Sequence, residues 1–465
     1  MQKFKYHCFL MIVAAAINGC SDNQEKNFSD TSTIEVLTYS QPSPTTPTDP
    51  NSPTVPNSPT APASATLSHQ DKIAQTPQET SPQTSPQTSP KKSPKTPQEM
   101  LPDVAAIVQQ IETTSGEIGR DSNGTIISVD LAKGRSSVSD EILRMTLQLP
   151  KLKKLRIASG SATPETLKQI GKQTNLEELY LQDIPIDNNT LAEILPKLSQ
   201  LKRLTLRSCN NITDQCTESI ISLPKLYLAA FIRMNLTRKG LEKIVESRKI
   251  TALDLRQCSL LTPDNYSLLK QMTQLTDLKI AGFSIDDSVL ETITQLHELR
   301  GLTIEDTMIS PEGFTKMTAN AKFAEKLTSL ILARNSTLFD THLETLKNFH
   351  RLKRLSVNSM MITGTFLIAL ATEESKRIKI ENLSLEKSLL TQEGATALKK
   401  FRELKSLNLA GVAMTQELVD IIATLETPEI INLSECQLDN EMLKTIRTMK
   451  SVKTLIVTDN PLIQK

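Results

Sequence analysis

Apolar residues in the C-terminal three quarters of the chain recur as a triplet, at positions 1, 4 and 6 of a unit that spans 24 to 28 residues. Leu152, Leu155 and Ile157 form one such triplet. The fourteen triplets begin at Ile126, Leu152, Leu176, Leu201, Leu226, Ile250, Leu275, Leu299, Leu327, Leu352, Ile380, Leu404, Pro428 and Val452. Apolar side chains at positions 4 and 6 follow the two-residue period of a strand, so the pattern predicts fourteen short strands in one register.

The second half of each unit carries the signals of a helix start. An apolar residue at position 11 or 12 is followed at once by a residue that accepts hydrogen bonds from a first helical turn, as in Ile212-Thr213. Pro311 takes a first helical position, and Glu312 places a negative charge near the positive end of the helix dipole. Each unit is therefore predicted to be a short parallel strand, a turn and a helix. Stacked units give an α/β solenoid with a concave sheet and convex helices.

The stretch from Leu201 to Ile221 reads LKRLTLRSCNNITDQCTESII and resembles the pattern LxxLxLxxCxxITDxxLxxL. This pattern is typical of the ribonuclease-inhibitor-like and cysteine-containing subclasses of the leucine-rich-repeat family. The resemblance covers residues 124–465 and implies a leucine-rich-repeat solenoid. In such a fold the concave sheet is the surface expected to bind a protein partner.

Position 9 departs from this pattern in many repeats. It is Cys at Cys209, Cys258 and Cys436, Asn at Asn335 and Asn460, and apolar at Met234, Phe283 and Met360. A side-chain hydrogen-bond ladder at this turn is therefore expected to be interrupted, with apolar packing in its place.

The four cysteines of the repeat region are predicted to be free, buried thiols. Cys209 and Cys258 occupy the same position two repeats apart, which places them roughly 10 Å from each other at strand spacing. That separation exceeds the ~7 Å between Cα atoms that a disulfide bridges. We expect the same state for Cys216 and Cys436.

Residues 1–20 have the features of a secretory signal peptide. Lys3 and Lys5 precede an apolar run over residues 9–17 that is too short to span a bilayer. The run ends in INGC, residues 17–20, which resembles the lipobox of bacterial lipoproteins. The resemblance implies that Cys20 is lipidated and that the mature protein is anchored to a membrane. An ordinary signal peptide or a short interfacial anchor with a chance cysteine is the alternative.

Residues 21–100 are predicted to form a disordered linker, because 14 prolines between Ser40 and Gln98 stand among Ser, Thr and Gln. Fully extended, some 60 such residues reach up to about 180 Å. Residues 101–123 are predicted to be a helical cap for the first repeat, since Val104, Ile107, Val108 and Ile111 recur at helical spacing. We expect a lipid-anchored protein of a bacterial envelope, at the outer membrane, facing either the periplasm or the exterior.

Composition excludes several classes of function. Lys and Arg total 53 and Asp and Glu total 52, so charge gives no reason to expect a nucleic-acid partner. The motifs of metalloproteases, phosphate loops, dinucleotide-binding folds and esterase elbows are absent, and the five histidines show no metal-liganding spacing. We therefore expect no enzymatic activity, no cofactor and no metal site.

Positions 2, 3, 5, 7 and 8 of each repeat are predicted to project from the concave sheet. Charges at position 2 alternate along neighbouring strands, as in Lys153, Glu177 and Lys202, which predicts a self-neutralising ladder. Six residues stand apart from this ladder, and we predict that they form a partner-binding site: Arg156, Tyr180, Arg207, Tyr227, Ile232 and Arg256. Tyr and Arg are among the residues most enriched in interface hot spots. A local shift of register that buries Leu228 or Ile232 is the alternative interpretation.

Two functions follow from this organisation. The first is a membrane-anchored scaffold that recognises a protein partner through the concave face. The alternative is a structural envelope lipoprotein whose solenoid self-associates or tethers envelope layers. Because the sequence runs only eight residues beyond Val457, an open strand edge is expected there, and a homodimer through that edge is a second hypothesis about partners.

Overall fold

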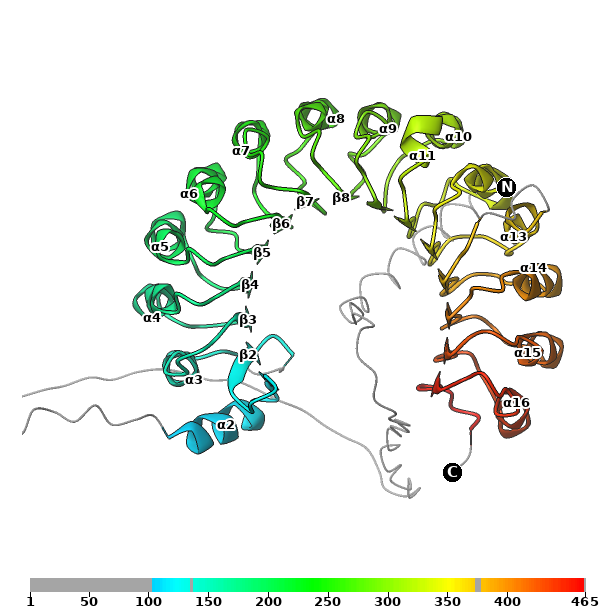
Figure 1. The fold of residues 1–465 in the computed structure, drawn as a ribbon, viewed down its shortest axis with the longest axis horizontal. Helices are drawn as coiled ribbons and strands as arrows, with labels where there is room; N and C mark the ends of the chain where they lie inside the picture. The colour runs from blue at the N-terminus through cyan, green and yellow to red at the C-terminus, as the bar shows by residue number, and fades with distance from the viewer. Residues whose placement is uncertain (1–102, 134–136, 373–377, 464–465) are drawn as a thin grey trace, which may run out of the picture.

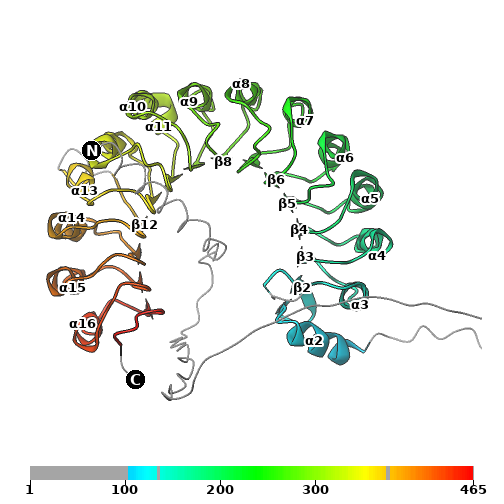
Figure 2. The same cartoon turned by 180° about the vertical axis from the view of Figure 1, so that it is seen from behind.

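The computed structural model describes residues 103–133, 137–372 and 378–463. The predicted signal peptide, Cys20 and the predicted linker lie outside these residues. The described chain curves into an open ring, with the strands along its inner side and the helices along its outer side (Figures 1 and 2). One hydrophobic core lies between the two layers.

The described strands form one sheet whose spatial order is the order of the chain. They are β1 Glu117–Arg120, β2 Ile126–Asp130, β3 Lys154–Ala158, β4 Glu178–Gln182, β5 Arg203–Arg207, β6 Leu228–Ile232, β7 Ala252–Asp254, β8 Asp277–Ala281, β9 Gly301–Glu305, β10 Ser329–Ile331, β11 Arg354–Ser356, β12 Asn382–Ser384, β13 Ser406–Asn408, β14 Ile430–Asn432 and β15 Thr454–Ile456. Strands β2 to β15 are parallel and in one register, so that Leu155 pairs with Leu179 and Leu179 with Leu204. The predicted solenoid of fourteen parallel strands is confirmed.

Helices cover the outer face of the sheet, one or two to a repeat. The α-helices are α2 Val104–Thr113, α3 Asp140–Thr146, α4 Pro164–Lys168, α5 Asn188–Ile194, α6 Thr217–Ser222, α7 Arg238–Ile244, α8 Pro263–Tyr266, α9 Asp287–Ile293, α10 Pro311–Ala319, α11 Ala321–Ala324, α12 Asp340–Leu343, α13 Phe366–Leu370, α14 Gln392–Ala397, α15 Gln416–Ala423 and α16 Asn440–Ile446. The 3-10 helices are η1 Gln169–Lys172, η2 Leu195–Lys197, η3 Asp214–Cys216, η4 Ser267–Gln271, η5 Glu344–Asn348 and η7 Leu398–Lys400. The predicted caps begin several of them: the Ser310 hydroxyl accepts from the Gly313 N–H at 3.0 Å and the Asp439 carboxylate from the Met442 N–H at 2.9 Å.

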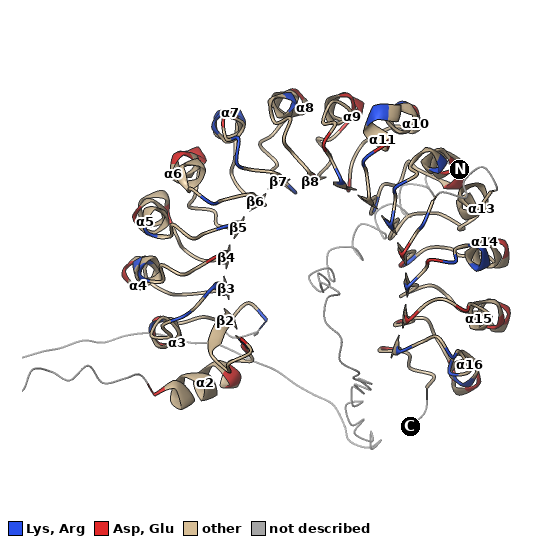
Figure 3. Cartoon of the chain, in the orientation of Figure 1, with Lys and Arg blue, Asp and Glu red and all other residues tan. Residues whose placement is uncertain are grey.

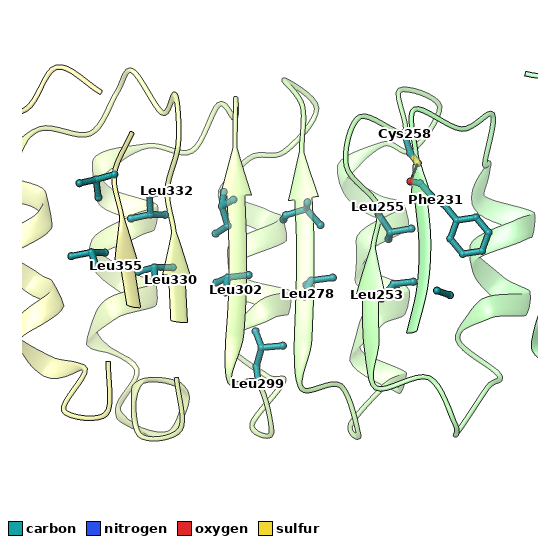
Figure 4. Close-up of a cluster of buried hydrophobic side chains, with 14 of the residues drawn as sticks. Phe231, Leu253, Leu255, Cys258, Leu278, Leu299, Leu302, Leu330, Leu332 and Leu355 are labelled. Carbon is teal, nitrogen blue, oxygen red and sulfur yellow. Dashed lines mark hydrogen bonds between the residues drawn. The ribbon is translucent and has the colours of Figure 1, made fainter. Parts of the chain in front are cut away.

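The residues of the repeated triplet form the strand side of the hydrophobic core. Leu278 and Leu302 are buried at position 4 of neighbouring strands, and Leu253 and Leu330 extend the same row on either side (Figure 4). Each unit has only one sheet strand and a short helix, so a single unit leaves its leucines open at both sides. They are removed from water only when the next unit stacks on them.

A continuous set of backbone hydrogen bonds joins the repeats. The residue at position 8 has positive φ in every repeat from Ser159 to Asp459. Its N–H donates to the position 7 carbonyl of the following repeat, from Ser159 to Gln182 at one end and from Glu435 to Thr458 at the other. A left-handed conformation costs a non-glycine residue roughly 1–2 kcal/mol. The hydrogen bond made by the same residue offsets that cost, which explains why most repeats keep this turn without a glycine.

The side chain at position 9 adds a second connection in some repeats. Cys258 Sγ donates to the Phe231 carbonyl at 3.0 Å (Figure 4), and Cys436 Sγ donates to the Leu409 carbonyl at 3.1 Å. Asn335 donates to the Ile304 carbonyl at 2.9 Å in the same place. Each acceptor is position 6 of the preceding repeat. The predicted interruption of this side-chain ladder is confirmed, although the backbone connection beside it is unbroken.

One position 9 residue does not pack as predicted. Met234 and Met360 are buried, whereas Phe283 is 76% exposed. Gly282 precedes Phe283 and has a φ of 129°, a conformation open to glycine, and Ile285 is fully buried two residues later. The chain therefore turns Phe283 outward and fills the turn with Ile285.

The ITD motif also joins neighbouring repeats. Asp214 accepts from both the N–H and the hydroxyl of Thr237 in the next repeat, at 2.8 and 2.5 Å. Asp287 binds Ser310 in the same way, at 2.7 and 2.6 Å. A Cβ at Gly313 would lie 2.1 Å from Asp287 Oδ1, so this contact requires glycine in the next helix. The motif thus fixes one helix start against the following one.

The N-terminal cap contains more than the predicted helix. Ile107 and Ile111 of α2 are buried, and Asp103 accepts from the Ala105 N–H at 3.0 Å as its N-cap. Strand β1 follows and pairs antiparallel with β2, which covers the free edge of the first parallel strand. The apolar spacing of α2 could indicate a helix but not this short polar strand.

The four repeat-region cysteines are free and buried, as predicted. Burial raises the pKa of the Cys258 thiol to about 12 and that of Cys436 to about 11. The thiols are therefore protonated donors to the preceding repeat at neutral pH, which is the state their hydrogen bonds require.

Replacement of a buried position 9 side chain should destabilise the solenoid. Asn335 is fully buried, and its Oδ1 accepts from the Thr307 N–H at 3.1 Å while its Nδ2 donates to Ile304. Asn335→Ala leaves these groups without partners, and we expect a loss of about 2–4 kcal/mol in the free energy of unfolding by urea. Ser336→Ala, at the exposed neighbour, should change it by no more than about 0.5 kcal/mol. Equal stability of the two variants would contradict this assignment.

Candidate partner-binding surface

The inner face of the sheet presents the side chains between the buried triplet residues. Strands β2 to β15 lie along the inside of the ring, and the helices cover only the outside (Figures 1 and 2). Positive and negative residues are interspersed along these strands (Figure 3). Partner recognition therefore depends on local clusters on this face rather than on one large charged field.

The predicted charge ladder at position 2 is confirmed in two stretches. Glu177 pairs with Lys153 at 3.7 Å and Lys202 at 2.6 Å. Farther along, Glu381 lies between Lys353 at 2.7 Å and Lys405 at 2.9 Å. These two lysines lower the pKa of the Glu381 carboxyl to about 2. Such residues neutralise one another and are poor candidates for specific binding.

Arg156 and Tyr180 form the best-defined cluster of the predicted site. They pair in register on β3 and β4, and the Arg156 guanidinium carbon lies 4.2 Å from the centroid of the Tyr180 ring. Arg156 Nε also pairs with Asp130 Oδ2 at 3.1 Å, and the Tyr180 hydroxyl donates to Gln182. The ion pair, the cation–π contact and the hydrogen bond restrict both side chains before a partner arrives.

Arg207, Ile232 and Arg256 lie at position 7 of three successive repeats. Arg207 pairs in register with Ile232, which is only 8% exposed. Ile232 was predicted to contact a partner, but its low exposure leaves it little area to offer. Arg256 is held against the sheet by Asp254, with Nη2 to Oδ2 at 2.8 Å.

Tyr227 lies apart from this row. It is 42% exposed at position 2, just before β6 begins and five residues before Ile232, or roughly 16 Å at the rise of an extended chain. No shift of register accompanies its repeat, because Leu204 still pairs with Ala229 and Leu206 with Phe231. The structure thus groups Arg156 with Tyr180 and Arg207 with Ile232 and Arg256, and separates Tyr227 from both. Their role in binding stays a prediction.

A polar cluster on the inner face of the β11 to β14 repeats was not predicted from the sequence. Its members, called the amide patch below, are Ser356, Asn358, Asn382, Ser384, Glu386, Asn408, Asn432 and Ser434. Asn408 Nδ2 donates to Ser384 Oγ at 3.0 Å and to Glu386 at 3.1 Å, which links the β12 and β13 repeats. A comparison of positions 3, 5 and 7 across successive repeats would have revealed it, since Ser and Asn replace many of the charged residues at these positions from β11 to β14.

In the part of the chain that the structure describes, no group of three or more His, Cys, Asp or Glu side chains is arranged to hold a metal ion. The helices described there are all too short or too polar to cross a membrane.

The register of these repeats defines the class of protein: the chain is a leucine-rich-repeat solenoid. No protein-family model matches it. Among solved structures it is similar to the Rad7 and Elc1 complex from yeast, at 18% identity and a TM-score of 0.48, over 70% of this chain and 81% of that one. It is also similar to an internalin from Listeria monocytogenes, at 16% identity and a TM-score of 0.35, over 77% and 96%. Likenesses this distant have no bearing on what this chain binds.

The stability contributed by the ladder at Glu381 should depend on pH. Its folded-state pKa of about 2 lies below the ordinary value, so its contribution is full above about pH 4.5 and is lost as the pH falls towards 2. Glu381→Gln should lower the free energy of unfolding by about 0.5–1 kcal/mol at pH 7, because the pairs are in contact with solvent. Urea titrations should show the two proteins converging below pH 3, whereas Glu426→Gln, in the turn before β14, should match the wild type throughout. A pH-independent difference would contradict the ion-pair origin.

Proposed function

We propose that this protein is a membrane-anchored scaffold of a bacterial envelope, of the ribonuclease-inhibitor-like and cysteine-containing leucine-rich-repeat subclasses, that recognises a protein partner through its inner face. The observation that carries the proposal is the Arg156–Tyr180 pair, on a sheet face that the described helices leave open. We assign the protein no enzymatic activity, cofactor or nucleic-acid partner.

The physical argument for this surface is preorganisation. A protein interface loses affinity when long side chains must be ordered on binding. Arg156 already pairs with Asp130, and Tyr180 already donates to Gln182. These two side chains therefore lose less conformational freedom on binding than unrestrained ones would. Arg and Tyr are also the residue types that carry the largest share of binding energy in interfaces. The amide patch on β11 to β14 supplies donors and acceptors farther along the same face.

The anchor is a separate part of the proposal. Cys20 would carry the acyl chains, and the Pro-rich residues 21–100 would hold the solenoid away from the membrane. Support comes from the INGC sequence and the short apolar run before it.

Cys20→Ala tests the anchor. The wild-type protein should sediment with membranes and incorporate radiolabelled fatty acid, whereas the variant should do neither, because it has no thiol at the lipobox. Cys8→Ala is the matched control and should behave like the wild type. Recovery of Cys20→Ala in the membrane fraction, with unchanged labelling, would overturn the assignment.

Photo-cross-linking tests the inner face. Benzoylphenylalanine at Tyr180 should give a discrete covalent adduct of higher mass when cells that produce the protein are irradiated. The same probe at Ala192, exposed on the outer helix α5, should give none. Arg156→Ala should lower the adduct yield by about tenfold, as expected for a hot spot, and Lys154→Ala on the same strand should change it little. Equal adducts at the two probe positions would refute the proposed surface.

A further inference from the structure

A row of exposed apolar side chains follows one edge of the solenoid, outside the inner face. It comprises Leu260, Phe283, Met308, Phe339, Met361 and Leu389, which we call the edge row. Each lies in the loop between the carboxyl end of a strand and the next helix, in six successive repeats from β7 to β12. Their exposed fractions range from 45% to 76%.

The fold does not require apolar residues in these loops. The same loops after β3, β4, β5 and β6 carry Ser161, Pro185, Asn210 and Asn235, all of which are exposed. The repeats there have the same register and the same turn at position 8. Side chains in the edge row therefore contribute little to the core, and exposed apolar residues that gather on one edge of a surface mark an interaction site.

Charge around the edge row selects the occupant. From the turn at position 8 to the second residue past the helix cap, these six loops carry seven acidic residues and two basic ones. The acidic residues are Asp264, Asp286, Asp287, Asp306, Glu312, Asp340 and Glu393. Both basic residues are already paired: Arg334 lies 2.8 Å from Asp306, and Lys387 lies 3.4 Å from Glu435.

This charge disfavours two other occupants. The positive ends of the six helices offset at most roughly half an elementary charge each, which leaves the edge negative. A second copy of the same edge would place like charges side by side. A bilayer with anionic headgroups would be repelled for the same reason. A partner that places cations beside an apolar stripe fits both features.

The geometry of the edge row fits a helix. Adjacent strands lie about 4.8 Å apart, and one turn of an α-helix rises 5.4 Å, so one apolar side chain per repeat can meet one per turn. Five strand intervals span about 24 Å at the sheet, the length of roughly 16 helical residues, and the loops fan outward from the strands, so the row is at least this long (Figure 1). A helix also satisfies its own backbone groups, whereas an extended segment would need a sheet edge to pair with.

We propose that the edge row is a second docking surface, separate from the Arg156–Tyr180 face, and that it binds a basic amphipathic helix of a protein partner. Phe283 is the main anchor residue, because it is the most exposed of the row, at 76%, and the backbone at Gly282 turns it away from the core. The partner's apolar stripe covers the row, and its Lys or Arg residues lie beside the acidic helix starts.

The test uses full-length protein and two synthetic 18-residue peptides with leucines at the same helical spacing, one filled with lysine and one with glutamate. The Leu/Lys peptide should bind in fluorescence anisotropy, more weakly as salt rises, and the Leu/Glu peptide should bind at least tenfold more weakly. The variant F283S/M361S should lose at least tenfold in affinity for the Leu/Lys peptide. Asn210→Ala/Asn235→Ala, on the polar part of the same edge, should bind like the wild type.

Folding is not at risk in these variants, since the replaced side chains are exposed, and unchanged thermal melting should verify this. Equal affinity of F283S/M361S and wild type would overturn the proposal, as would a preference for the Leu/Glu peptide. Dimerisation of the wild type that the variant abolishes would assign the row to a second copy instead. Binding to phosphatidylcholine and phosphatidylglycerol vesicles that depends on Phe283 and Met361 would assign it to a lipid surface.

Discussion

Backbone hydrogen bonds between successive repeats are the interaction on which the rest of this structure depends. At position 8 the chain adopts a left-handed turn, and the N–H exposed there reaches the carbonyl at position 7 of the next repeat. At position 2 the carbonyl of each repeat accepts from two N–H groups of the next one, as Lys153 does from Glu177 and Glu178. These two rows of bonds hold the strands at a fixed spacing, which allows the leucines to bury themselves against their neighbours.

A fixed spacing has consequences for both proposed surfaces. On the inner face it brings Arg156 over the ring of Tyr180, two side chains that are 24 residues apart in the chain. On the loop edge it brings one exposed apolar residue from each of six successive repeats to the same side of the solenoid. In both cases the proposed surface is made of residues from several adjacent repeats, and no single repeat contains it. Solenoids build extended binding surfaces from short units in this way.

Much of the fold could be predicted because the triplet at positions 1, 4 and 6 is a local signal with a single physical solution. The register survived even at Leu226, where Ala229 and Phe231 replace leucines. Features that depend on tertiary context could not be read in this way. The outward turn of Phe283 depends on the positive φ of Gly282, the burial of Ile232 depends on its surroundings in the folded sheet, and β1 is recognisable only by its pairing with β2. The site prediction gave one cluster of six residues, whereas the structure places Arg156 over the ring of Tyr180 and Tyr227 at a different position of its repeat, and the role of all six in binding stays a prediction.

Residue-resolved hydrogen exchange of the native protein tests the central claim most directly. The account predicts slow exchange at the position 8 amide of every repeat from Ser159 to Glu435, in one uninterrupted series, and faster exchange at exposed loop amides such as that of Ser336. Protection confined to separate groups of repeats, with fast position 8 amides between them, would contradict it. The chain would then consist of several independent cores rather than one continuously bonded solenoid.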